Sequence, residues 1–364
     1  MLLRHWFCAG HVSGIPRTGD YLLIELGTES AIVIRTAAGE VRVLLNVCRH
    51  RGSRLCTGRS GKAQSARLTC PYHAWTYDLD GNLLVARQMP ESFRRADFSL
   101  KSLPVRIMEG LIFTTFAKDP LDLAVAADAL ARSAGVHGWA SAKIAHREVY
   151  SIKANWKLAV ENYMECYHCT PAHAEFAKRH VYARPAEQNV ELERAGRTRA
   201  EALGIVVPDI DLYGCAAGGG ESVAVMRSAL HDGIASATAD GRPVGRPMGS
   251  FSASDGNSTY FDIGPISDFL AYPDHGVIYR FIPKTVDCTE MEVIWLVHQE
   301  AVEGVDYDVD RLTWLWRTTS AEDKKIVEMN QAGVNSRYFE PGPYSVQETY
   351  AARFVEWYLR ELCA

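Results

Sequence analysis

The sequence predicts an α+β protein of two domains, an all-β domain over residues 1–120 and a domain of sheet and helices over 121–364. Short runs of branched apolar residues between glycine turns fill the first third of the chain, which is typical of small β domains. Near residue 120 the composition changes to an alanine- and leucine-rich segment, 122–134, that favours a helix. With 364 residues, 47% of them apolar, the chain is long enough to form two hydrophobic cores.

Within each domain, apolar patterning predicts the individual elements. In the first domain, short apolar runs between turn residues predict strands over 21–26, 31–35, 41–47 and 110–116, with two further short strands around a turn at Asp80-Gly81. In the second, apolar runs predict strands over 276–283 and 290–299. Helical spacing predicts helices over 155–168, 307–317, 320–333 and 345–362, whereas the polar segment 194–204 is expected to be mostly loop.

Charge and cysteine content argue against several classes of protein. The formal net charge is −5 with acidic and basic residues interspersed, so no basic patch indicates nucleic-acid binding. No apolar run reaches the roughly 18 residues of a membrane span, and the first ten residues lack the features of a secretory signal. Nine cysteines are too few for a disulfide scaffold, and their odd number does not suit full pairing. We therefore expect a cytoplasmic globular protein without membrane or nucleic-acid partners.

Two pairs of metal-binding residue types stand close together in the first domain. Cys48 and His50 are followed, after nineteen intervening residues, by Cys70 and His73. Two thiolates and two imidazoles can close a tetrahedral zinc site, or they can hold a [2Fe–2S] cluster with the cysteines on one iron and the histidines on the other. Zinc fingers usually group like ligands, whereas each pair here holds one of each kind. The mixed order favours the cluster and leaves zinc as the alternative.

The flanking stretches CRHRG and CPYHAWTYDLDG resemble the two cluster-binding loops of Rieske proteins. Respiratory Rieske proteins carry an extra cysteine in each loop and a serine after the second, and Tyr72 and Trp75 stand at the positions of the second cysteine and the serine. Fewer hydroxyl hydrogen bonds to cluster sulfur imply a lower reduction potential. Cys56 then has no disulfide partner and is expected to be a small core residue. The resemblance implies a cluster that supplies electrons to oxygen chemistry.

A second candidate metal site lies in the segment ENYMECYHCTPAH. His168 and His173 are five residues apart and would diverge on a continuous helix, but Pro171 disfavours helix at Thr170 and lets the chain fold back. Two imidazoles and one carboxylate form the facial triad of non-haem iron oxygenases. A lone histidine is more often a core residue, yet the preceding Glu165 and the upstream cluster loops favour a metal here.

This segment resembles the Glu-Asn-x2-Asp/Glu-x2-His-x4-His motif of the α subunits of Rieske non-haem iron, ring-hydroxylating-type oxygenases, and the resemblance covers essentially the whole chain. It implies a Rieske domain, then a helix-grip (START-like) catalytic domain, and a homotrimer in which the cluster of one subunit faces the mononuclear Fe(II) of its neighbour. Asn162 is implied to be catalytic, and Glu165 to bridge His168 and the partner subunit's His73. Relatives carry some tens of residues before HWFCAGHV, so we expect the N-terminal family segment to be missing here.

The third iron ligand is expected at Glu322 or Asp323. Both acids have apolar residues one helical turn further on, so periodicity alone does not separate them. The resemblance to the E-D-x4-E-x-x-Q segment of the family favours Asp323. The implied ligand set is therefore His168, His173 and Asp323.

Residues 295–345 resemble those of glycine betaine monooxygenases and their stachydrine- and carnitine-oxidising relatives. This implies an oxygenase component that takes electrons from NAD(P)H through a flavin and iron–sulfur reductase and uses O2 to N-demethylate a quaternary ammonium compound, releasing formaldehyde. Hydroxylation or O-demethylation of an aromatic acid, and a non-enzymatic Rieske electron carrier, remain as alternatives. Aromatic faces are expected to bind a quaternary nitrogen. Five aromatic residues of the predicted sheet are candidates, although core packing explains most such residues: Tyr260, Phe261, Tyr272, Tyr279 and Trp295.

Overall fold

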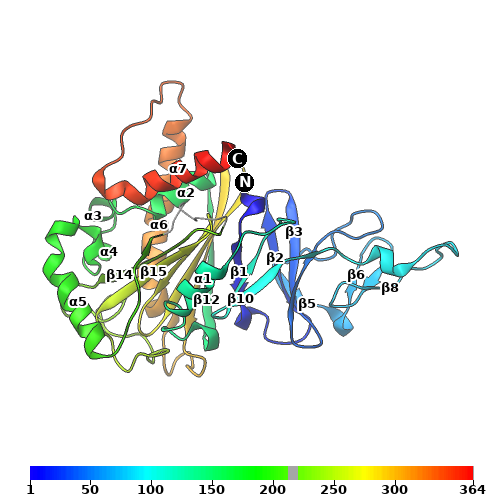
Figure 1. Ribbon diagram of the computed structural model, residues 1–364, viewed down its shortest axis with the longest axis horizontal. Helices are drawn as coiled ribbons and strands as arrows, with labels where there is room; N and C mark the ends of the chain where they lie inside the picture. Colours follow the sequence, from blue (N-terminus) through cyan, green and yellow to red (C-terminus); the bar gives the residue numbers. More distant parts are fainter. Residues whose placement is uncertain (212–219, 364) are drawn as a thin grey trace. The chain divides into compact units, whose positions relative to one another are not determined.

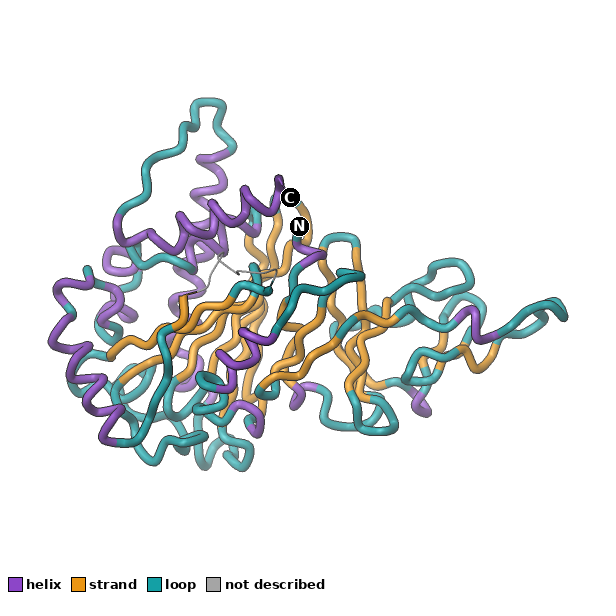
Figure 2. Tube along the Cα trace, viewed as in Figure 1, coloured by secondary structure: helices purple, strands orange, loops and turns teal. Residues whose placement is uncertain are grey.

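The computed structural model describes residues 1–211 and 220–363, and it divides into two compact units. One unit comprises Leu3–Pro120, and the other comprises Met1–Leu2 and the chain from Leu121 onward. The first is built of strands and short 3-10 turns, and the second combines one large sheet with helices (Figure 1 and Figure 2). The predicted α+β class is therefore confirmed.

The first unit consists of three antiparallel sheets. The five-stranded sheet has the order β5-β2-β3-β4-β9, formed by β5 (Ser60–Lys62), β2 (Asp20–Leu26), β3 (Glu29–Arg35), β4 (Val41–Leu45) and β9 (Ser102–Leu103). The sheet β1-β11-β10 contains β1 (Phe7–His11), β11 (Leu111–Thr114) and β10 (Val105–Met108). The sheet β6-β7-β8 contains β6 (Leu68–Thr69), β7 (Thr76–Tyr77) and β8 (Leu83–Val85). All the strands expected in this domain are present, with ends shifted by a few residues.

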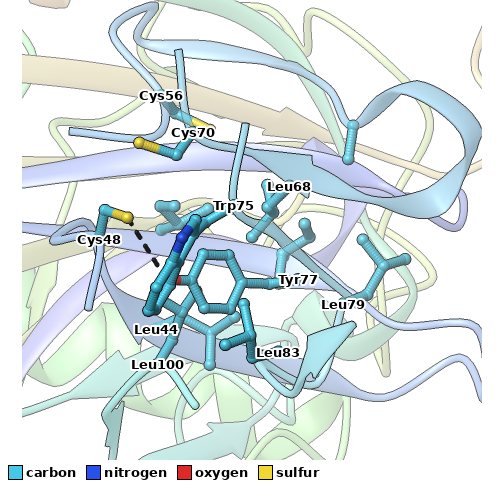
Figure 3. Close-up of a cluster of buried hydrophobic side chains, with 13 residues drawn as sticks. Leu44, Cys48, Cys56, Leu68, Cys70, Trp75, Tyr77, Leu79, Leu83 and Leu100 are labelled. Carbon is cyan, nitrogen blue, oxygen red and sulfur yellow. Dashed lines mark hydrogen bonds between the residues drawn. The ribbon is translucent and has the colours of Figure 1, made fainter. Parts of the chain in front are cut away.

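The core of the first unit reaches directly to the candidate cluster cysteines. Figure 3 shows Trp75 and Tyr77 packed among leucine side chains next to Cys48. Cys48 and Cys70 are each 2% exposed. Cys56 is a free cysteine buried in the same core, as expected for a small apolar residue.

The second unit is organised around a seven-stranded antiparallel sheet with the order β12-β18-β17-β16-β15-β14-β13. Its strands are β12 (Lys143–Ile152), β13 (Ile210–Asp211), β14 (Val223–Ala229), β15 (Asn257–Ile263), β16 (Ser267–Ala271), β17 (Gly276–Thr285) and β18 (Cys288–Val297). The helices are α1 (Ala124–Ala131), α2 (Trp156–Tyr163), α3 (Cys169–Ala172), α4 (Ala174–Ala177), α5 (Val190–Ala202), α6 (Val309–Val334) and α7 (Thr349–Cys363). Helix α2 contacts β17, β18, α6 and α7, so it lies between the sheet and the other two helices (Figure 1).

Three expectations about helices were wrong. The helices predicted over 307–317 and 320–333 form the single helix α6, because the threonines between them continue the helix, and Thr318 donates a hydrogen bond to the Trp314 carbonyl one turn earlier. The predicted loop over 194–204 lies mostly in α5, which buries only Gly196 and Ala200 and so lacks an apolar stripe. The third expectation was a single helix over 155–168, but the observed helix α2 ends at Tyr163. None of the described helices is both long and apolar enough to cross a bilayer.

Candidate metal centres and substrate cavity

The four residues of the first candidate metal site come together at the ends of two loops. The Nδ1 atoms of His50 and His73 are 3.1 Å apart, and both imidazoles are exposed. Both cysteines lie inward of them in the core, and the Cys48 and Cys70 thiols are close enough to interact. Two buried sulfur donors and two exposed nitrogen donors fit a [2Fe–2S] cluster whose histidine-ligated iron faces outward.

Backbone hydrogen bonds hold each loop in its turn. The Gly52 N–H donates to the Cys48 carbonyl, and the Ala74 N–H donates to the Cys70 carbonyl. The His50 ring stacks on Trp75 with ring centroids 4.8 Å apart. The aromatic residue at the position of the respiratory serine therefore packs against a candidate ligand and offers no hydroxyl.

The sequence reasoning missed a hydroxyl that reaches the candidate cluster ligand Cys48. The Tyr77 oxygen lies 3.4 Å from the Cys48 Sγ atom (Figure 3), and it accepts a hydrogen bond from the Arg49 N–H. Its own proton is then directed to the sulfur. The sequence gives no sign of this contact, because Tyr77 and Cys48 are 29 residues apart and Tyr77 looks like an ordinary strand residue.

Replacing Tyr77 with phenylalanine is expected to lower the reduction potential of the cluster by tens of millivolts. A hydrogen bond to sulfur stabilises the more negative reduced state, and its net value of about 1 kcal/mol corresponds to a shift of this size. A redox titration followed by visible circular dichroism measures the shift. Tyr72→Phe is the matched control, because the Tyr72 hydroxyl contacts Arg51 at the surface. An unchanged potential in Tyr77→Phe would show that the hydroxyl does not act on the cluster.

The second candidate site is built on a chain reversal after α2. The helix stops at Tyr163, and a disulfide joins Cys166 and Cys169 across the turn that presents His168. The break between α3 and α4 lies at His173, with φ −121° and ψ 71°. The expectation that Pro171 disfavours helix at Thr170 was wrong. Both residues lie in the first turn of α3, where the missing N–H of proline costs no hydrogen bond.

The two histidines and Asp323 point one atom each at a common centre. The distances between these atoms are 3.1 Å for His168 Nε2 to His173 Nε2, 2.8 Å for His173 Nε2 to Asp323 Oδ1, and 3.3 Å for His168 Nε2 to Asp323 Oδ1. Donors about 2.1 Å from a metal are about 3.0 Å apart at right angles and about 3.4 Å apart in a tetrahedron. The observed spacings are short enough for all three atoms to bind one metal ion, as the ligands of a facial triad do.

Each imidazole is held from behind by a glutamate. Glu165 Oε1 lies 2.5 Å from His168 Nδ1, and Glu322 Oε2 lies 2.7 Å from His173 Nδ1. A carboxylate at Nδ1 fixes the tautomer that leaves Nε2 free for a metal. The structure thus gives Glu322 and Asp323 different positions, with Asp323 at the centre and Glu322 behind an imidazole. This separates the two acids, which helical periodicity did not.

Asn162 and the neighbouring carboxylates set the charge environment of the two histidines. The Asn162 amide nitrogen is 3.3 Å from His168 Nε2. Burial lowers the pKa of His168, but hydrogen bonds to Asp323 and Glu165 outweigh it and raise this pKa to about 9. Burial opposes the charge on Asp323, yet hydrogen bonds from both histidines lower its pKa. The centre therefore favours positive charge, as a site for a metal cation must.

A cavity with an empty volume of about 820 Å³ opens beside this centre. His168, His173, Asp323, Glu165 and Asn162 all line it. Six aromatic residues from six different elements form much of the remaining wall: Tyr163, Phe176, Tyr182, Tyr260, Trp316 and Tyr350.

Of the five aromatic candidates from the sequence, only Tyr260 lines this cavity. The others are core residues with an exposure of 3% or less: Phe261, Tyr272, Tyr279 and Trp295. Periodicity within a strand shows which residues share a face, but it does not show which part of that face a helix covers. The five aromatics that the sequence missed lie on helices and a 3-10 turn outside the sheet.

Comparison with known proteins gives concordant matches over both units. Residues 5–104 match the Rieske [2Fe-2S] domain family, and residues 139–363 match the ring hydroxylating alpha subunit (catalytic domain) family. The glycine betaine monooxygenase oxygenase subunit of Pseudomonas aeruginosa PAO1 is 36% identical over 362 residues, which cover 98% of this chain and 83% of that protein. The carnitine monooxygenase oxygenase subunit of Acinetobacter baumannii is 29% identical over 340 residues, covering 92% and 80%.

A solved structure with the same fold is that of a quaternary ammonium Rieske monooxygenase, reported for its insights into carnitine oxidation and inter-subunit electron transfer. Its TM-score is 0.71 at 24% identity, and the match covers 100% of this chain and 89% of that one.

Proposed function

This chain belongs to the family of ring-hydroxylating oxygenase α subunits with a Rieske [2Fe–2S] domain, and we propose that it N-demethylates a quaternary ammonium compound such as glycine betaine or stachydrine. A chain of this family is an oxidoreductase that uses a Rieske cluster, a mononuclear iron, O2 and electrons from a reductase. The proposal assigns the cluster to Cys48, His50, Cys70 and His73, and the iron to His168, His173 and Asp323.

An iron held by His168, His173 and Asp323 would supply the chemistry that activates O2, and a cluster held by Cys48, His50, Cys70 and His73 would deliver the electrons that come from NAD(P)H through the reductase. The net reaction places one oxygen atom in a C–H bond of an N-methyl group and reduces the other to water with a pair of electrons and a pair of protons. The cationic carbinolamine product then loses its hydroxyl proton to solvent and breaks its C–N bond, which gives formaldehyde and the tertiary amine. The chain holds the ligand imidazoles through Glu165 and Glu322, and the cavity wall orients the methyl group toward the iron.

The composition of the cavity wall is the observation that favours a quaternary ammonium substrate. It offers six aromatic faces, and its described lining contains carboxylates but no Lys or Arg. Aromatic faces attract a desolvated ammonium. An aromatic acid would bring an uncompensated negative charge into this wall, whereas a betaine carries its own positive charge beside the carboxylate. The similarity to enzymes named for glycine betaine and carnitine supports the same choice.

We further propose a homotrimer in which the cluster of one subunit reduces the iron of the next. The imidazoles of His50 and His73 are exposed and available for a contact with another subunit. Glu165, which lies behind His168, could accept a hydrogen bond from one of them. The related structure, with its reported inter-subunit electron transfer, supports this arrangement. Dependence on NAD(P)H suits a cytoplasmic location.

Purified holoenzyme, supplied with a reductase and NADH, is expected to release formaldehyde from glycine betaine or stachydrine in proportion to the NADH consumed. A methoxybenzoate is the comparison substrate, because O-demethylation would also release formaldehyde. Formaldehyde from the methoxybenzoate alone would overturn the proposal in favour of an aromatic acid. An iron content of about two per chain instead of about three, with no substrate-dependent O2 uptake, would indicate an electron carrier.

A further inference from the structure

Two aspartates face each other on the hairpin of β15 and β16, at the cavity beside the iron centre. Asp262 and Asp268 are direct cross-strand neighbours, and their carboxyl groups are close enough to interact. Asp262 lines the cavity. Asp268 lies behind it, 1% exposed, and its Oδ2 atom has no hydrogen-bond partner within residues 1–211 and 220–363.

Two carboxyl groups in contact at a buried site share one proton, because both cannot be ionised together. Burial raises the pKa of Asp262 to about 7, and burial together with the charge of Asp262 raises the pKa of Asp268 well above its ordinary value. The pair therefore carries at most a single negative charge at neutral pH, located where a ligand in the cavity can reach it.

The other acids of the cavity wall are already engaged. Glu165 accepts a hydrogen bond from His168, and Asp323 lies between the two histidines. By contrast, Asp262 makes no ion pair with a Lys, Arg or His of the described chain. Positions 212–219 contain no Lys or Arg in the sequence. A buried negative charge without a cationic partner is unfavourable, so the missing partner should come from the ligand.

We propose that Asp262, supported by Asp268, is the anionic anchor that binds the positively charged head of the substrate. Tyr260 stands two residues before Asp262 on the same face of β15 and provides an aromatic wall next to it. The Tyr182 ring lies against Tyr260, with centroids 5.7 Å apart, and Tyr350 also lines this cavity. The site thus combines one carboxylate with several ring faces, which suits an ammonium without N–H donors.

The inference rests on the proposed function only in taking an ammonium compound as the substrate, and it is tested by binding. Anaerobic calorimetry of the iron-loaded holoenzyme compares glycine betaine with tert-butylacetate, and choline with its alcohol analogue, in which carbon replaces nitrogen. Each pair has the same shape and differs by the positive charge. The ammonium member is expected to bind at least about tenfold more tightly, since a carboxylate acts on a desolvated cation. Equal affinities within both pairs would overturn the proposal without any variant.

Substitutions then show which residue causes the tighter binding of the ammonium ligand. Asp262→Asn is expected to lower the affinity ratio severalfold by weakening the ammonium member alone, and the aromatic faces should account for the preference that remains. Asp268→Asn should keep the ratio, because Asp262 is then charged without sharing its proton. Glu161→Gln is the matched control, because Glu161 is an acid on α2 outside the cavity lining whose pKa is likewise raised by burial to about 7. A ratio unchanged in Asp262→Asn, or equal weakening of both members, would contradict the proposal.

Two further outcomes separate this inference from the demethylation. If Asp262→Asn does not fold or load iron, loss of the ratio in Asp268→Asn would overturn the anchor, and its retention would support it. If no quaternary amine yields formaldehyde while the preference still depends on Asp262, the demethylation fails and the anchor stands. If Asp262→Asn demethylates glycine betaine with an unchanged KM, the anchor fails and the demethylation stands.

Discussion

Replacing Glu165 with glutamine is expected to leave both metal centres loaded and yet to slow turnover by about a hundredfold. One oxygen of Glu165 holds His168 Nδ1, and the other accepts the backbone N–H groups of Tyr167 and His168. A carboxylate has lone pairs left for a second imidazole N–H, which we propose is that of the partner subunit's His73, whereas an amide has one oxygen and two N–H groups. The substitution would therefore break the proposed link between the two imidazoles while replacing no proposed metal ligand.

A single-turnover experiment separates this effect from loss of metal. Reduced enzyme with substrate is mixed with O2, and reoxidation of the cluster is followed by its visible absorbance. In Glu165→Gln the cluster should stay reduced while the iron content remains at the wild-type value. Glu322→Gln makes the same chemical change behind His173, away from the proposed path, and should reoxidise its cluster at the normal rate once iron is loaded. Normal reoxidation in Glu165→Gln would exclude the bridging role.

Mixing two inactive variants tests whether electrons pass from one subunit to the next. A Cys48→Ser chain is expected to lack the cluster, and a His168→Ala chain to lack the iron. Neither is active alone, but a mixed assembly should regain activity, because an intact cluster can then face an intact iron in the next subunit. Failure of all mixed assemblies to turn over would contradict transfer between subunits.

The candidate metal ligands that lie close together in sequence could be identified from it, because their geometry is local. Cys48 and His50 share one loop, and His168 and His173 share one chain reversal, so spacing and residue type carry most of the information. The fold class followed in the same way from short β runs and from the composition change near residue 120. The supporting contacts are different, because Tyr77 reaches Cys48 from a strand 29 residues away.

The substrate cavity could not be predicted in this way. Its aromatic wall is assembled from single residues of six elements, and of these only Tyr163 lies within a motif recognised from the sequence. Tyr260 and Asp262 share a strand face that is also typical of an ordinary core strand. The meeting of Asp262 and Asp268 depends on hairpin register, and a shift of one residue would turn one of them to the opposite face of the sheet.

Replacing Asp323 with alanine is expected to abolish turnover and to lower the iron content from about three to about two per chain, since the mononuclear site keeps only two of its three protein ligands. Asp323 Oδ1 lies 2.8 Å from His173 Nε2 and 3.3 Å from His168 Nε2, at the shared centre. Glu322 reaches only the far nitrogen of His173. The two adjacent acids of α6 therefore predict two different phenotypes.

Metal analysis together with electron paramagnetic resonance of the reduced cluster distinguishes these phenotypes. Asp323→Ala should retain the full cluster signal, because no cluster ligand lies in its unit, and should lose the iron that reacts with nitric oxide. Glu322→Gln, like Glu165→Gln, should keep that iron, and it should bind it somewhat more weakly, since an amide oxygen is a weaker acceptor than a carboxylate for the His173 N–H. The reverse pattern, with iron lost in Glu322→Gln and kept in Asp323→Ala, would make Glu322 the ligand. A carboxylate can either coordinate the metal or orient an imidazole, and here the distances assign one role to each of two neighbouring residues.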